Sequence, residues 1–155
     1  MKIFVLSFVS CKEYVSRLPN EKTSILSIRD PLASPYFSLD MNKNIYDILT
    51  LNFSDKSPLY PDEFRFNKEK AESIVDFIYE SIDNNVENIL IHCNLGLSRS
   101  KTVGIVIYEK LKGIHLPKHI GCNKHIYSTL NTVWEENLKE RKVFYGEIIT
   151  NFVKE

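Results

Sequence analysis

The segment from residue 88 to residue 113 constrains the fold of this chain more than any other. A short apolar run, 88–92, is followed directly by a loop that contains Gly96 and then by a helical pattern, 99–112, which stops at Gly113. Short apolar runs without alternation are typical of strands that a parallel sheet buries on both faces. Glycine often follows the last residue of a helix because it readily adopts a left-handed conformation. The segment therefore predicts a strand, a loop and a helix of an α/β protein.

Further strands and helices alternate along the rest of the chain. Apolar, β-branched and aromatic residues predict a strand over 3–9, and a capping box formed by Ser10 and Glu13 predicts a short helix that ends at about Leu18. The alternation predicts an α/β fold with a short, mostly parallel central sheet flanked by helices. The other expected elements are strands over 24–29 and 44–53, a helix capped by Asn67 that ends before Asn84, a helix from about Asn123, and a helical segment over 143–153.

The charges of the chain are balanced, with 20 basic and 20 acidic side chains among 155 residues. This length suits a single catalytic domain over 1–155 with one hydrophobic core. The balance removes the long-range field by which proteins attract nucleic acids and anionic membranes. We therefore expect no membrane partner and regard a nucleic acid as a disfavoured one. An anionic substrate would have to be held by a local site.

The cysteines and the apolar segments indicate a compartment. Cys11, Cys93 and Cys122 are too few and too widely spaced for a disulfide framework, so we expect free thiols in a reducing compartment, the cytoplasm. No apolar stretch reaches the roughly 18 residues of a membrane-spanning helix. The apolar run near the amino terminus is better explained by a buried strand than by a secretory signal.

The loop between the strand 88–92 and the helix 99–112 holds the residues with the clearest chemistry. Backbone N–H groups at the start of a helix, together with the helix dipole, bind oxyanions such as phosphate. Arg99 would lie at that helix start, where its planar guanidinium can pair with two phosphate oxygens. Cys93 would lie at the base of the same loop, and both influences should lower the pKa of its thiol. We therefore predict a thiolate nucleophile directed at the phosphorus of a bound phosphate ester.

Residues 92–100 read HCNLGLSRS and resemble the signature loop of the cysteine-dependent protein tyrosine phosphatases, H-C-x-x-G-x-x-R-[S/T]. The ending G-x-S-R-S is similar to that of the compact dual-specificity branch of this superfamily, and the resemblance in element order runs from about Lys2 to Lys112. It implies a dual-specificity phosphatase-like fold and a protein phosphatase without metal or other cofactor. The implied substrate is a protein that carries phosphotyrosine, with phosphoserine and phosphothreonine as further substrates.

The resemblance also implies a role for each residue of the loop. Cys93 would form a cysteinyl-phosphate intermediate, Arg99 would bind the phosphate, and the Ser100 hydroxyl would help the thiolate to leave. His92 would orient the loop and tune Cys93 rather than transfer a proton. The side chain of Leu95 departs from the family, in which many members carry a small residue there. The backbone N–H groups that would surround the phosphate belong to Asn94, Leu95, Gly96, Leu97 and Ser98.

The family also uses an aspartate as general acid, because phenolate and alkoxide groups leave poorly without a proton. Two candidates lie in the proline-punctuated loop after the strand 44–53. Asp62 precedes Cys93 by 31 residues, which matches the family separation of roughly thirty, whereas Asp55 precedes it by 38. Asp55, however, follows directly on the strand, where the family acid usually lies, and residues 56–60 read as an insertion. We favour Asp55 and keep Asp62 as the alternative.

The sequence also allows other functions for this loop and suggests roles for cysteines and histidines outside it. The same loop could serve a non-catalytic module that binds phosphoproteins, an RNA 5′-phosphatase of the same fold, or sulfur and arsenate chemistry. The loop lacks lysines at positions 94–98, which disfavours phosphoinositide head groups. Cys11 or Cys122 could protect an oxidised Cys93 by forming a disulfide. The spacing of His115, His119 and His125 does not suggest a metal site, and we expect them at the surface of a loop.

Overall fold

The computed structural model describes residues 1–17, 20–32, 42–54, 61–116 and 121–145, with side chains up to residue 139. Four parallel strands form one sheet in the order β1-β4-β2-β3. In chain order the elements are β1 (Lys2–Ser7), α1 (Phe8–Ser16), β2 (Thr23–Arg29), β3 (Ile45–Asn52), the 3₁₀ turn η1 (Asp62–Phe64), α2 (Lys68–Asp83), β4 (Asn88–Cys93), α3 (Arg99–Lys112) and α4 (Lys124–Tyr145).

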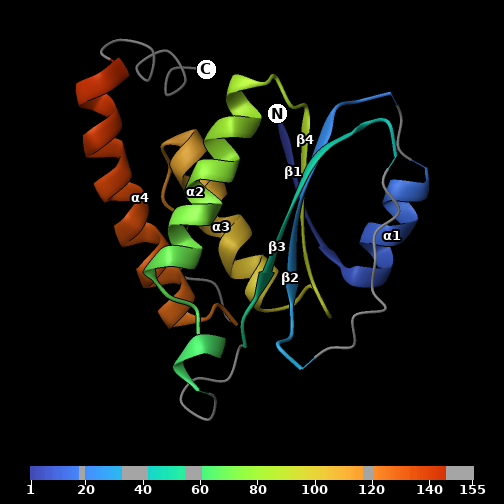
Figure 1. Ribbon diagram of the computed structural model, residues 1–155, viewed down its shortest axis with the longest axis horizontal. Coiled ribbons are helices and arrows are strands. Elements are labelled where there is room, and N and C mark those ends of the chain that lie inside the picture. Colours follow the sequence, from blue (N-terminus) through green and yellow to red (C-terminus); the bar gives the residue numbers. More distant parts are fainter. Residues whose placement is uncertain (18–19, 33–41, 55–60, 117–120, 146–155) are drawn as a thin grey trace.

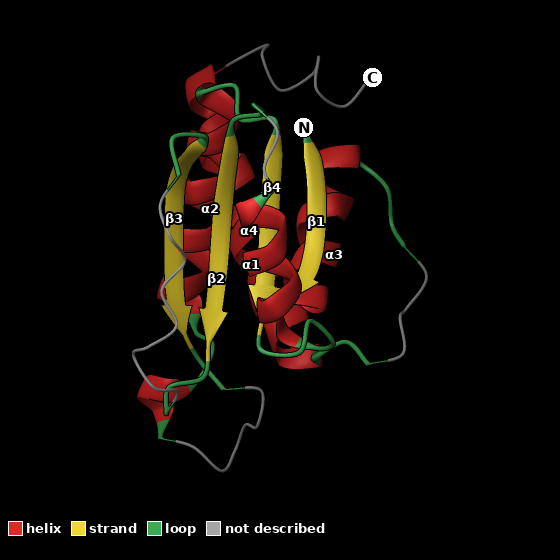
Figure 2. Ribbon diagram, turned by 90° about the vertical axis from the view of Figure 1, so that its right-hand side faces the viewer, coloured by secondary structure: helices red, strands yellow, loops and turns green. Residues whose placement is uncertain are grey.

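Helices cover both faces of this sheet. Helix α1 lies against one face, whereas α2, α3 and α4 lie on the other, as Figures 1 and 2 show. The alternation of side chains along each strand divides the core accordingly. On β4, Ile89 and Ile91 belong to the cluster with α2, α3 and α4, whereas Leu90 belongs to the cluster with Cys11 and Val15 of α1. The predicted α/β architecture, with helices on both faces of a parallel sheet, is therefore confirmed.

Strand β4 is the most deeply buried part of the sheet. All six of its residues are buried, and it pairs in parallel with β1 on one side and β2 on the other. Its register places Cys93 opposite Ser7, the last residue of β1. The carboxyl ends of parallel strands share one edge of the sheet, which lies at the bottom of Figures 1 and 2. The loop that follows Cys93 therefore begins at this edge, between the start of α1 and the loop that follows β2.

The helix boundaries follow their caps, and one differs from the prediction. The predicted capping box of Ser10 and Glu13 is wrong, because α1 begins three residues earlier: the Ser7 hydroxyl accepts a hydrogen bond from the Ser10 N–H at 3.1 Å. The strand therefore ends at Ser7 instead of residue 9. Asn67 caps α2 as predicted, since its side chain accepts from the Lys70 N–H at 3.0 Å. The predicted segment 143–153 is helical as far as Tyr145, and its remainder lies outside the described residues.

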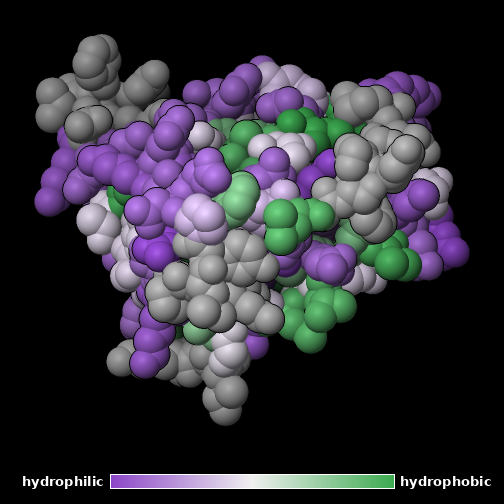
Figure 3. Space-filling view, turned by 60° about the horizontal axis from the view of Figure 1, so that its bottom comes forward, coloured by the Kyte–Doolittle hydropathy of each residue, from purple (hydrophilic) through white to green (hydrophobic). Residues whose placement is uncertain are grey.

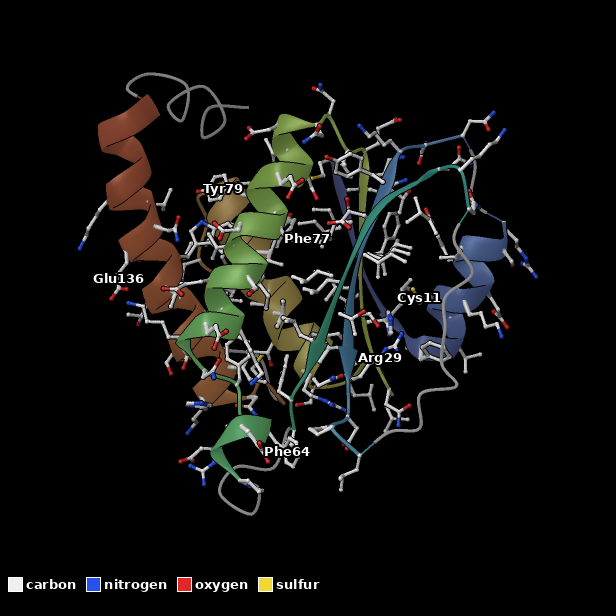
Figure 4. All side chains as sticks on the ribbon, viewed as in Figure 1. Cys11, Arg29, Phe64, Phe77, Tyr79 and Glu136 are labelled. Carbon is white, nitrogen blue, oxygen red and sulfur yellow. The ribbon has the colours of Figure 1, made fainter. Side chains whose placement is uncertain are left out.

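Helices α2 and α4 pack together on the outer side of the hydrophobic cluster that contains Ile89 and Ile91 of β4. Figure 4 labels Phe77 and Tyr79 on α2, and the rings of Tyr79 and Trp134 lie 5.9 Å apart. Trp134 is 1% exposed and belongs to the hydrophobic core. No helix among the described residues is long and apolar enough to cross a membrane.

Candidate active site

The loop 93–98 joins the end of β4 to the start of α3, as the sequence predicts. Gly96 has a φ of 74°, and a Cβ atom at this position would lie 2.7 Å from the backbone of Leu6 and Ser7. Glycine is therefore required for the close approach of the loop to β1 as well as for its left-handed conformation. The Phe8 N–H donates to the Asn94 carbonyl at 3.2 Å and ties the other side of the loop to the start of α1.

The Cys93 sulfur is surrounded by hydrogen-bond donors. The backbone N–H of Gly96 and the hydroxyl of Ser100 each donate to Sγ at 3.2 Å, and Cys93 and Ser100 are 3% and 0% exposed. Burial alone would raise the pKa of the thiol. The hydrogen bonds from the Ser100 side chain and the Ser100 and Gly96 backbones, together with the charge of Arg99, outweigh burial and lower the pKa. The arrangement favours a thiolate, as the sequence predicts.

Arg99 is the first residue of α3 and is almost completely buried, with 7% exposed. Its Nη1 donates to the carbonyl oxygen of Phe53 at 2.8 Å. Phe53 follows the last residue of β3, which is separated from β4 by β2, so this bond joins the start of α3 to the carboxyl end of the edge strand. The guanidinium therefore has a fixed position beside the loop, and the sequence did not indicate its carbonyl partner.

The other loop residues differ strongly in exposure. The side chains of Leu95 and Leu97 are 70% and 69% exposed, so they contribute nothing to the hydrophobic core. The carbonyl of Ser98 accepts the first backbone hydrogen bond of α3, from the Thr102 N–H at 2.8 Å. Since residues 94–98 lead directly into this helix, their backbone lies at its positive end. Of the donors expected from these residues, the structure directs the Gly96 N–H at the Cys93 sulfur.

His92 lies on the face of the sheet opposite to Cys93, because the two residues are adjacent in β4. Its ring contacts that of Phe8 edge to face, with centroids 5.4 Å apart, and it is 1% exposed. Burial lowers the pKa of His92 to about 4, and the positive charge of Arg29 adds to this effect. The imidazole is therefore neutral at pH 7, and its packing fixes the strand end that carries Cys93.

Of the two candidate acids, the structure describes Asp62 alone. Asp55 lies outside the described residues. Asp62 begins η1, its side chain is 91% exposed, and it forms an ion pair with Arg65 at 2.8 Å. An exposed carboxylate paired with a neighbouring arginine is typical of a solvated aspartate in a turn.

The segment between β3 and α2 is anchored at both of its ends. The Ser54 N–H donates to the Phe64 carbonyl at 2.8 Å, which closes the segment into a loop. The Lys70 ammonium donates to the carbonyls of Glu63 and Arg65 at 3.0 and 2.9 Å. The sequence did not single out Lys70, because a surface lysine in the first turn of a helix has no distinguishing pattern. Together with the Arg99 bond to Phe53, these contacts fix the two ends of the loop that contains Asp55.

The three histidines predicted to lie at a loop surface divide as follows. His115 is exposed, with its Nδ1 3.4 Å from a carboxylate oxygen of the buried Glu109, and His119 lies outside the described residues. His125 lies in the first turn of α4, and its Nε2 is 2.7 Å from the carbonyl oxygen of Phe66. His125 is exposed, as predicted, but it belongs to a helix instead of a loop, and its contact helps to fix the end of the loop before α2. Within the described part of the chain, no three His, Cys, Asp or Glu side chains gather as metal ligands.

Neither of the two other cysteines forms a disulfide with Cys93. Cys11 is completely buried in α1, on the opposite face of the sheet, and burial raises the pKa of its thiol to about 12 (Figure 4). Cys122 is partly buried shortly before α4. All three thiols are free.

Comparison with known proteins identifies the fold. No protein-family model matches the sequence, and no curated protein matches it. Among solved structures, the PTP-2 phosphatase of Cydia pomonella aligns with a TM-score of 0.57 and 18% identity over 85% of each chain. The human tyrosine phosphatase-like serine/threonine/tyrosine-interacting protein aligns with a TM-score of 0.55 and 18% identity over 92% of each chain. The chain therefore has the fold of these tyrosine phosphatase-like structures, as the signature loop predicts.

Proposed function

We propose that this protein is a phosphatase that hydrolyses phosphotyrosine in proteins through a cysteinyl-phosphate intermediate on Cys93. One observation carries the proposal: the Cys93 sulfur accepts hydrogen bonds from both Gly96 and Ser100, beside the buried cation of Arg99, so that its pKa is lowered despite burial. A cysteine with a purely structural role in a core lacks such donors, and burial then raises the pKa of its thiol. The fold shared with known phosphatases supports the same conclusion.

In the first step, the Cys93 thiolate attacks the phosphorus of the bound monoester. A sulfur–phosphorus bond forms as the bond from phosphorus to the tyrosine oxygen breaks, and the leaving oxygen takes a proton from a carboxylic acid. Arg99 and the backbone N–H groups of residues 94–98 stabilise the charge on the three other phosphate oxygens. We assign the acid to Asp55, because Arg99 fixes the carbonyl of Phe53, two residues before it. Asp62, exposed and paired with Arg65, is the alternative.

In the second step, water attacks the phosphorus and the sulfur–phosphorus bond breaks. The carboxylate formed in the first step takes a proton from the water, and inorganic phosphate is released. The leaving group is now the Cys93 thiolate, and the hydrogen bond from the Ser100 hydroxyl stabilises the negative charge that returns to it. His92 keeps its neutral ring packed against Phe8 and positions the end of β4.

A non-catalytic phosphoprotein-binding module is the second candidate. One of the structural neighbours is a tyrosine phosphatase-like interacting protein, so the same fold occurs in a protein that is named for an interaction. Against it stands the Ser100 hydroxyl on the Cys93 sulfur, since a module that only binds phosphate has no need of a leaving thiolate. RNA 5′-phosphate hydrolysis is a weaker alternative because the chain has no net positive charge.

The test is hydrolysis of an aryl phosphate and of phosphotyrosine peptides in the presence of a chelator. The wild-type protein and Cys122→Ser, a control at a partly buried cysteine outside the loop, should both be active. Cys93→Ser and Arg99→Lys should lose activity by about a thousandfold or more, because the first lacks the nucleophile and the second lacks a planar pair of donors. Activity that survives Cys93→Ser would refute the mechanism. A wild-type protein that binds phosphotyrosine peptides without hydrolysing them would favour the binding module.

A further inference from the structure

A pocket of about 320 Å³ lies beside the loop 93–98, at the carboxyl edge of the sheet. Cys93 and Asn94 form part of its wall, so the pocket is continuous with the site proposed for the phosphate. Its other walls come from the start of α1, the end of β2 and the residues that follow β2. Among the described residues, those that line it are Phe8, Ile28, Arg29, Asp30, Leu32, His92, Cys93 and Asn94. We call it the Leu32 pocket.

The described residues that line the Leu32 pocket form mostly apolar walls, and their charges cancel at neutral pH. Arg29, labelled at the lower end of the sheet in Figure 4, is followed by Asp30, so the two charges on the wall oppose each other. The Arg29 Nε donates to the Ser27 hydroxyl at 3.3 Å, and the Asp30 carboxylate accepts from the Leu32 N–H at 3.0 Å. The pKa of about 4 keeps His92 neutral. A strongly charged ligand group would gain little here.

Apolar side chains are also exposed around this edge of the sheet. Figure 3, seen from that side, shows hydrophobic residues at the surface among polar ones. Leu32 is 71% exposed, and eight large hydrophobic residues among the described ones are classed as exposed. Three of the eight, Leu32, Leu95 and Leu97, lie in the loops after β2 and β4. A fourth, Val9, lies in the first turn of α1, which begins where β1 ends. Exposed apolar residues that gather at one place mark a surface that another molecule covers.

We propose that the Leu32 pocket binds an apolar side chain that neighbours the phosphotyrosine in a peptide substrate. This inference rests on the proposed function, because the phosphate in the loop 93–98 fixes where the peptide lies. A peptide whose phosphate is held in the loop 93–98 would therefore lie beside a pocket that shares Cys93 and Asn94 with the phosphate site. Nucleic-acid binding relies on lysines and arginines that neutralise phosphate groups, whereas the exposed residues named above are apolar.

Binding of non-hydrolysable peptides tests the proposal separately from catalysis. We would measure the Kd of peptides that carry a phosphonate analogue of phosphotyrosine, flanked by leucine, serine or glutamate, by fluorescence anisotropy. The leucine-flanked peptide should bind wild-type protein about tenfold more tightly than the serine-flanked one, as expected for one buried apolar side chain. Leu32→Ser should abolish this preference and Leu32→Met should keep it. Ile114→Ser, a control at another exposed apolar residue, should not affect it.

Three outcomes would overturn the inference. These are equal affinity for all three peptides, a preference that persists in Leu32→Ser, and tighter binding of a 5′-phosphorylated oligonucleotide than of the leucine-flanked peptide. Hydrolysis of a small aryl phosphate, measured in parallel, tests the proposed function instead. If the aryl phosphate is not hydrolysed but the leucine preference is present and depends on Leu32, the catalytic proposal fails and the pocket assignment stands.

Discussion

Substitution of Ser100 by alanine tests the link between the structure of the loop and its chemistry. The Ser100 hydroxyl is completely buried and lies 3.2 Å from the Cys93 sulfur, and it is the strongest of the influences that lower the pKa of this thiol. Alanine removes the oxygen and one donor but leaves the first turn of α3 intact. A hydrogen bond to a charged group contributes about 1.5–3 kcal/mol. Its loss should therefore slow the step that releases the thiolate by roughly ten- to a hundredfold.

Two assays follow the effect. The rate of alkylation of Cys93 by iodoacetamide as a function of pH reports the thiolate directly, and its midpoint should move to higher pH in Ser100→Ala. The pH profile of kcat/KM for an aryl phosphate should lose activity on its acid side over the same range, because less thiolate is present at each pH below the midpoint. Rapid mixing should show a burst of phenol followed by slow turnover, since release of the thiolate becomes limiting.

Ser73→Ala is the matched control, because its hydroxyl also lies on a helix and donates to a backbone carbonyl, that of Glu69, at 3.0 Å. It should change neither assay. The reasoning would be refuted if Ser100→Ala left the alkylation midpoint and kcat unchanged while the protein remained folded. An equal change in Ser73→Ala would show that the effect is a general loss of stability.

Three further predictions concern neighbouring residues. The pKa of His92 is about 4 in the folded protein and 6.5 ordinarily, so the unfolded chain binds the proton at a higher pH than the folded chain does. As the pH falls from about 6.5 to 4, the free energy of unfolding measured by urea denaturation should therefore decrease by about 3 kcal/mol. His92→Asn should not show this decrease. Lys70→Met removes the ammonium that donates to the carbonyls of Glu63 and Arg65 and so anchors the loop that contains the proposed acid. The kcat should therefore fall at least about fivefold more for phenyl phosphate than for 4-nitrophenyl phosphate, whose leaving group needs less help from an acid. Gly96→Ala should weaken binding of inorganic phosphate by at least about tenfold in calorimetry, since its Cβ would meet the β1 backbone.

Each of these predictions has a result that contradicts it. Parallel pH curves for wild-type protein and His92→Asn would show that His92 titrates normally in the folded state. An equal loss for both esters in Lys70→Met would show that Lys70 stabilises the fold without positioning the acid. Unchanged phosphate affinity in Gly96→Ala would mean that the loop does not hold the anion in the geometry described.

The sequence was most informative where one residue type meets a strict requirement. The apolar run before Cys93 predicted a fully buried strand, and Gly96 and Gly113 have the left-handed conformations that glycine permits. The resemblance to the signature loop implied that the Ser100 hydroxyl acts on the Cys93 thiolate, and in the structure this hydroxyl donates to the Cys93 sulfur at 3.2 Å. These features depend on short-range geometry, so the order of residues is enough to predict them.

Features that depend on distant parts of the chain were not predictable in this way. Ser7 and Ser10 are both suitable caps, and the choice of Ser7 follows from the pairing of β1 with β4, which ends the strand opposite Cys93. The bond from Arg99 to the Phe53 carbonyl joins residues 46 positions apart, and a backbone acceptor has no sequence signature. Lys70 acts on carbonyls for the same reason. The assignment of the acid to Asp55 over Asp62 stays a prediction.

The identity of the nucleophile is the central claim, and trapping the intermediate tests it most directly. Wild-type protein would be mixed with an aryl phosphate in the presence of a chelator, quenched with acid within one turnover, and digested for mass spectrometry. We predict one phosphoryl group on the peptide that contains Cys93, attached to sulfur, and none on the peptides that contain Cys11 or Cys122. Turnover of the ester without phosphoryl transfer to Cys93 would contradict the account.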